Sequence, residues 1–152
     1  MTYSAAEGRQ QILDELAEAT DAIAAALAAL GVAYEQLDEA AADRLEERLF
    51  RPVQAAYGRA KRTHAAFAER SRLPGRTFAQ APAHGASKGV RALVDDAVSA
   101  VDRADATLAE LQDSMLPVDV GDAELRAGLA EVREALAGTR AGARELVRTF
   151  GR

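Results

Sequence analysis

The chain has 152 residues, a formal net charge of −5 and no cysteine. This length suits one domain, taken as residues 1–152, with a hydrophobic core of its own. The absence of cysteine excludes disulfides and thiolate metal sites. Only 5% of the residues are aromatic, so we expect an aliphatic core. Alanine and arginine are frequent while lysine occurs twice, a bias typical of bacteria with GC-rich genomes.

The first predicted helix covers about residues 4–30. Its apolar residues recur at alternating intervals of four and three, namely Ile12, Leu16, Ala19, Ile23, Ala26 and Leu30. Gly31 follows them and predicts a left-handed C-cap. The apolar run from Ala22 to Tyr34 is too short to span a bilayer, and the N-terminus lacks the pattern of a signal peptide. We therefore expect a cytoplasmic protein with no membrane span.

The second predicted segment covers about residues 33–71, again with apolar residues at helical spacing. Pro52 lies inside it, and an interior proline removes a backbone hydrogen bond and clashes with the preceding turn. We expect a long helix that is kinked or broken near Pro52. Residues 72–86 contain two prolines and two glycines and predict a basic loop. Its length is typical of a loop that is either functional or disordered.

The third and fourth predicted helices follow the loop. The third begins near Ser87 and ends at Pro117, while Asp122 is a good N-cap for the fourth. Both carry an unbroken heptad of mainly apolar residues. In the third helix these residues are Val90, Val94, Ala97, Val101, Ala104, Leu108, Leu111 and Met115. In the fourth they are Leu125, Leu129, Val132, Leu136, Thr139, Ala143, Leu146 and Phe150.

The residues beside the two heptads predict how the helices pack. Folding the pair about Val120 places Asp105 opposite Arg133 on a charged rim. The other flank carries small residues, including Gly128 and Gly142, which permit close approach of further helices. The predicted fold is all-α, an antiparallel up-down four-helix bundle.

The segment from Arg51 to Arg91 contains nine basic residues and one acidic residue, whereas the rest of the chain has 10 basic and 23 acidic residues. Eight of the nine are candidates for an anion- or partner-binding surface: Arg51, Arg59, Arg62, Arg70, Arg72, Arg76, Lys88 and Arg91. One interpretation is binding of an anion such as a nucleic-acid backbone. The other, which we favour, is pairing with the acidic first segment and with the acidic cluster at residues 38–47.

Two further residues are candidates for a site. Phe78 lies in the basic loop and either plugs one end of the bundle, which we favour, or is an exposed docking aromatic. His64 falls on the apolar face of the second segment. It lacks the Glu-x-x-His spacing of di-metal bundles, so we interpret it as a core residue and expect no metal.

The sequence contains no phosphate-binding loop, nucleophile elbow or His-Glu-x-x-His motif. We therefore expect no enzymatic activity and no cofactor. The leading hypothesis is a helical-bundle interaction or scaffold protein, either a homodimer or bound to another protein. Nucleic-acid binding through residues 51–91 is the first alternative. Binding of an apolar small molecule between the helices is the second.

Overall fold

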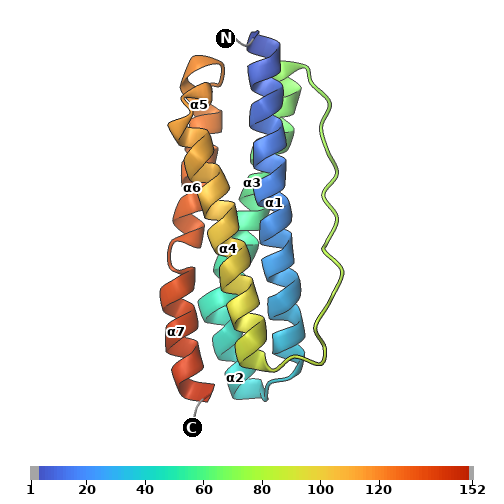
Figure 1. The fold of residues 1–152 in the computed structure, drawn as a ribbon, viewed down its shortest axis with the longest axis vertical. Helices are drawn as coiled ribbons and strands as arrows, with labels where there is room; N and C mark the ends of the chain where they lie inside the picture. Colours follow the sequence, from blue (N-terminus) through green and yellow to red (C-terminus); the bar gives the residue numbers. More distant parts are fainter. Residues whose placement is uncertain (1–3, 151–152) are drawn as a thin grey trace.

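The computed structural model describes residues 4–150, and within that range it contains helices and loops but no strand. The long helices lie side by side along the longest axis of the molecule (Figure 1). The all-α class predicted from the sequence is therefore confirmed.

Helix α1 spans Ala5–Glu35, and the side chain of Ser4 caps it by accepting a hydrogen bond from the Glu7 N–H. All six residues of the predicted apolar stripe are fully buried. The C-cap expected at Gly31 is wrong, because α1 continues to Glu35. One further turn of helix buries Ala33 completely, which a left-handed residue at Gly31 would prevent.

Helix α1 is also long and apolar enough to cross a membrane by length and composition alone. Half of its most apolar stretch is buried inside the structure, and the core helix of a soluble protein passes the same test.

The second segment is helical without interruption from Glu39 to Ser71. It comprises α2 (Glu39–Leu45), the π-helical turn η1 (Glu46–Phe50) and α3 (Arg51–Ser71). The chain therefore does not break near Pro52. A π turn widens the backbone immediately before the proline, where an α-helix would press the ring against a carbonyl of the preceding turn. The helix starts later than expected because residues 36–38 reverse the chain, and Asp38 then caps α2.

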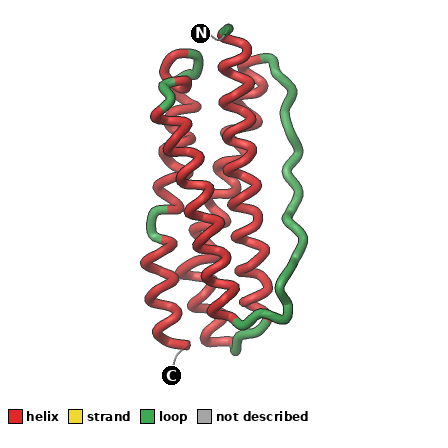
Figure 2. The backbone as a smooth tube through the Cα atoms, viewed as in Figure 1, coloured by secondary structure: helices red, strands yellow, loops and turns green. Residues whose placement is uncertain are grey.

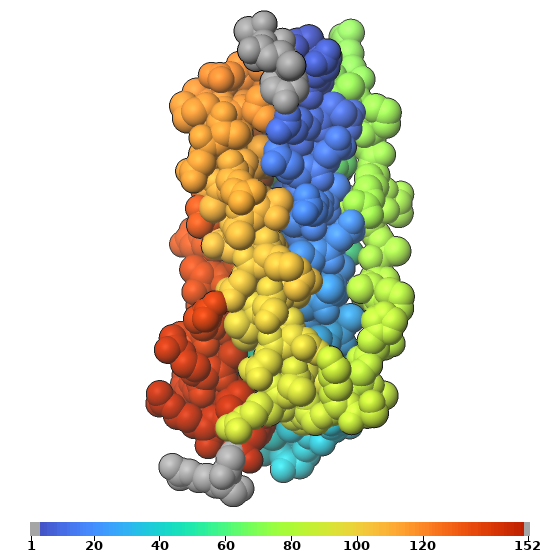
Figure 3. Space-filling model, in the orientation of Figure 1, coloured from blue at the N-terminus to red at the C-terminus, as the bar shows by residue number. Residues whose placement is uncertain are grey.

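Residues 72–89, which we call the strap, form an extended connection. Arg72 ends α3 in the left-handed conformation, with φ 58°. The strap then runs along the outside of the molecule from one end to the other (Figure 2). In the space-filling view it lies along the flank of α1 (Figure 3). It is three residues longer than the predicted loop because α4 begins at Val90, with Gly89 rather than Ser87 as N-cap.

The C-terminal half contains more helices than predicted: α4 (Val90–Asp113), α5 (Leu116–Asp119), α6 (Ala123–Leu136) and α7 (Thr139–Phe150). Helix α4 ends before Pro117, which lies inside the short α5, because Met115 adopts a left-handed conformation with φ 68°. The fourth predicted helix is divided at Ala137 and Gly138. Asp122 caps α6 as predicted.

Helix α1 packs against α4 and α3, while α3 packs against α6, and α7 lies against η1 and α4. The small-residue flank faces α3: a Cβ atom on Gly128 would lie 2.4 Å from Thr63 Oγ1. On the opposite rim, Arg133 donates to Asp105 at 2.8 Å. Both predictions drawn from the heptad flanks are confirmed.

Candidate functional site

A groove of about 500 Å³ lies between α1 and α3 beside the strap. We call it the strap groove. It is lined by Ala24, Leu27, Ala28, Gly31, Val32 and Glu35 of α1, by Phe50, Gln54, Tyr57, Gly58 and Lys61 of η1 and α3, and by Gln80, Ala81 and Ala83 of the strap. Most of these side chains are apolar, so the groove offers a mainly hydrophobic surface.

The groove exists because small residues face each other across two packed helices. Ala24, Ala28 and Gly31 recur along one side of α1, with Gly58 opposite on α3. A Cβ atom added to Gly31 would meet no atom within 4 Å. The α1 wall from Ala24 to Glu35 is about 16 Å long at the helical rise of 1.5 Å per residue. The space is therefore elongated along the helices.

Two charged residues line the strap groove, Lys61 and Glu35. Lys61 is half-buried, and its Nζ lies 4.4 Å from the centroid of the Tyr57 ring. Glu35 is exposed. Neither forms an ion pair within residues 4–150. Because α1 and α3 run in opposite directions (Figure 1), the two charges lie at opposite ends of the groove.

The strap is attached to the helices near both of its ends. Phe78 packs edge to face on His64, with ring centroids 5.2 Å apart. Arg76 stacks on the Phe78 ring, 4.8 Å from its centroid, and pairs with Asp21 at 2.9 Å. Gln36 donates to the carbonyl of Lys88 at 3.0 Å. Phe78 thus packs against the side of α3 rather than plugging an end of the helices.

His64 is buried, as predicted from its place on the apolar face. Burial lowers its pKa, the backbone of Leu13 and the charge of Asp14 raise it, and Arg76 lowers it further. Its Nδ1 atom has no hydrogen-bond partner within the described part of the chain. These properties are those of a largely neutral core histidine.

Four of the eight predicted anion-binding residues form ion pairs: Arg59 with Glu131, Arg70 with Asp122 and Glu124, Arg76 with Asp21, and Lys88 with Asp96. Pairing was expected with the first segment and residues 38–47, but most of the acidic partners belong to α4 and α6. Helix α3 packs against α6, which brings those carboxylates to the arginines of α3.

The other four predicted residues, Arg51, Arg62, Arg72 and Arg91, are exposed and have no ion pair within residues 4–150. Arg72 and Arg91 lie near opposite ends of the strap, which runs the length of the molecule (Figure 2). The structure therefore does not bring the eight residues together into one continuous basic surface.

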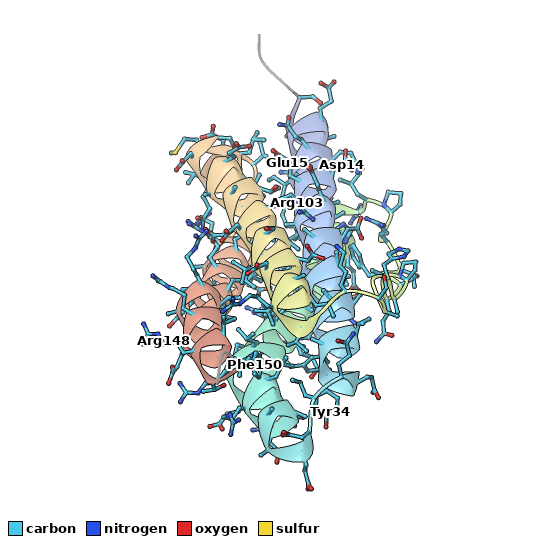
Figure 4. The ribbon with its side chains drawn as sticks, turned by 60° about the horizontal axis from the view of Figure 1, so that its bottom comes forward. Asp14, Glu15, Tyr34, Arg103, Arg148 and Phe150 are labelled. Carbon is cyan, nitrogen blue, oxygen red and sulfur yellow. The ribbon has the colours of Figure 1, made fainter. Side chains whose placement is uncertain are left out.

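Carboxylates gather where α1 meets α4. Burial raises the pKa of Glu15, and the charges of Glu18, Glu110 and Asp14 raise it further, while a hydrogen bond from Gln11 lowers it. Figure 4 shows Glu15 on the side of α1 that faces α4, with Asp14 on the side away from α4. Within residues 4–150 no three histidine or acidic side chains are placed to hold a metal ion.

No protein-family model matches this chain, and no curated protein or solved structure is significantly similar to it. The functional argument therefore rests on the geometry above. The strap groove was not located by sequence reasoning, which suggested only that an apolar small molecule could bind between the helices. The available signal was the spacing of Ala24, Ala28 and Gly31 along one flank of the first apolar stripe.

Proposed function

We propose that this chain is a non-enzymatic binding protein that holds a small apolar molecule in the strap groove. Ligand pockets in proteins usually measure about 300–1,000 Å³ and are mostly apolar with a few polar groups. The observation that carries the proposal is the groove of about 500 Å³ with such a lining. In this proposal the fold is an antiparallel up-down four-helix bundle, whose four long helical segments are α1, α2 to α3, α4, and α6 to α7. The protein is cytoplasmic and has no membrane span.

The exposed surface favours binding of a small ligand over the leading hypothesis from the sequence, which was a homodimer or a protein partner. The large apolar side chains exposed within residues 4–150 are Tyr34, Met115 and Val118. Tyr34 lies near the end of α1, whereas Met115 and Val118 lie at and within α5, at the other end of the molecule (Figure 1). They do not form the contiguous patch that is typical of an interface.

Nucleic-acid binding has less support than the groove. Half of the candidate residues already have carboxylate partners. A backbone-binding surface depends on several clustered and available positive charges, because its affinity comes from release of counterions.

The proposal is tested by titrating the protein with the neutral dye Nile red and following its fluorescence. We expect saturable binding of one dye per chain. Replacing Gly31 with leucine fills the groove, so Gly31→Leu should weaken binding by about tenfold or more, the scale of overpacking an apolar site. The substitution favours helix formation, so the variant should remain folded.

Ala106→Leu is the matched control, because Ala106 is an exposed residue inside α4 and does not line the groove. It should bind Nile red as the unmodified chain does. Circular dichroism melting of both variants verifies folding. Absence of saturable binding to the unmodified chain, or equal binding by the folded Gly31→Leu variant, would refute the proposal.

A further inference from the structure

Resting on the proposed function, we propose that the strap groove binds an amphipathic acid. The apolar chain of this ligand lies along the groove between α1 and α3, and its carboxylate or other anionic end group binds the ammonium of Lys61.

Lys61 is placed to receive an anion. Its Nζ lies over the face of Tyr57, 4.4 Å from the ring centroid, and both residues line the groove. A cation–π contact orients the ammonium without neutralising its charge. Because Lys61 has no carboxylate partner within residues 4–150, that charge is available to a ligand.

The neighbouring charges fix the direction of the ligand. The positive charge of Arg76, in the strap, is close enough to Tyr57 to interact with it. Arg76 is already paired with Asp21 at 2.9 Å, however, so it is not available to bind the ligand. Glu35 lines the opposite end and is exposed. Its negative charge repels an anion from that end. Because Lys61 is half-buried, solvent and salt screen its charge less than they screen the charge of Glu35. The anionic group of the ligand therefore belongs at the Lys61 end.

The shape of the groove favours an extended chain. Small side chains along α1 leave a channel about 16 Å long at the helical rise, with Leu27, Val32 and Phe50 as larger apolar walls. The strap closes one side through Gln80, Ala81 and Ala83. A linear apolar chain contacts such a channel along its whole length, and each methylene that it buries strengthens binding.

Three amphiphiles with the same chain test this assignment by competing with Nile red: dodecanoate and dodecyltrimethylammonium, each below its micelle concentration, and dodecanol below its solubility limit. We expect dodecanoate to bind about fivefold or more tightly than dodecanol, the scale of a partly exposed charged contact. Dodecyltrimethylammonium should bind most weakly, and the preference for the acid should decrease as salt is added.

Variants of Lys61 and of the neighbouring exposed residue Arg62 complete the test. Lys61→Met replaces the charged side chain with an unbranched apolar one. The preference for dodecanoate should therefore disappear, while dodecanol binds as before. Lys61→Arg should retain the preference. Arg62→Met is the matched control, because Arg62 is exposed, has no ion pair within residues 4–150 and does not line the groove, so it should leave the order of the three ligands unchanged.

The outcomes separate this inference from the proposed function. Equal binding of acid and alcohol, tighter binding of the ammonium, or a preference that survives in Lys61→Met overturns the amphipathic acid. The groove proposal still stands if Gly31→Leu blocks dodecanol in that case. Failure of all three amphiphiles and of Nile red to bind overturns both.

Discussion

The ring of Phe78 meets His64 edge to face at 5.2 Å, and this contact joins the strap to α3. Arg76 lies against the same ring and pairs with Asp21 of α1. Phe78 thus contacts both His64 of α3 and Arg76, which is paired with α1. Through these contacts the strap is attached to the two helices that form the walls of the strap groove. The position of the strap depends on packing as well as on its ion pairs.

Phe78→Ala should release the part of the strap around residue 78 from its contact with α3. Full burial of a phenylalanine is worth about 3–5 kcal/mol in such substitutions, and this ring is only partly buried, so we expect a loss of about 1 kcal/mol in unfolding free energy. Local opening should increase, and trypsin should cleave after Arg72 and Arg76 faster in the folded protein. Phe78→Leu keeps much of the contact and should be cleaved more slowly than Phe78→Ala. Identical cleavage of the alanine variant and the unmodified chain would contradict this account of the strap.

Gly128→Ala should destabilise the contact between α6 and α3. The added Cβ would lie 2.4 Å from Thr63 Oγ1 and 2.7 Å from its Cγ2, and overpacking of this kind costs about 1–3 kcal/mol. Urea denaturation measures the loss. Adding Thr63→Ala removes both clashing atoms and should restore part of the stability, an interaction that a double-mutant cycle isolates. Gly31→Ala is the matched control and should stabilise the protein by up to about 1 kcal/mol, because its Cβ meets no atom within 4 Å.

Asp122→Ala should cost about 1–2 kcal/mol, because Asp122 caps α6 by accepting from the Leu125 N–H at 2.8 Å. Asp122→Asn keeps the cap and loses the ion pair with Arg70, so it should cost less than the alanine variant. The hydrogen bond from Arg70 lowers the pKa of Asp122 below its ordinary value of 3.8. Its contribution is therefore present above pH 3.8 and is lost as the pH falls through the lowered pKa. Equal urea midpoints for the two variants at pH 7 would show that the cap has no effect.

His64 should make the protein less stable in mild acid. Burial lowers its pKa in the folded state below the ordinary value of 6.5, so the unfolded chain takes up a proton first as the pH falls. Stability is full above pH 6.5 and declines between 6.5 and the lowered pKa. Comparing urea denaturation at pH 7.5 and pH 5 for the unmodified chain and for His64→Gln isolates this effect from the charges of Asp14 and Arg76. Parallel losses in the two proteins would show that His64 does not titrate differently on folding.

The spacing of apolar residues was sufficient to predict the long helical segments and their buried faces, but not the short α5 or the division between α6 and α7. Val94, Leu108, Leu129 and Leu146 are all buried as their heptads require, because the direction of a side chain on a helix follows from 3.6 residues per turn. The pairing of Asp105 with Arg133 followed from the same periodicity. Local signals at helix ends were less reliable: Asp122 caps a helix as predicted, whereas Gly31 lies inside one.

Only the tertiary structure decided the path of the strap, the partners of the basic residues and the strap groove. The strap has no apolar period, so its position depends on surfaces that form after the helices have packed, such as the face of α3 on which Phe78 meets His64. Arg59 and Glu131 are 72 residues apart in the chain, and no local pattern joins them. The groove likewise arises from small residues on α1 and α3 that face each other only in the folded protein. Sequence periodicity determined which face of each helix is buried, but the contacts between distant segments determined where the strap groove lies.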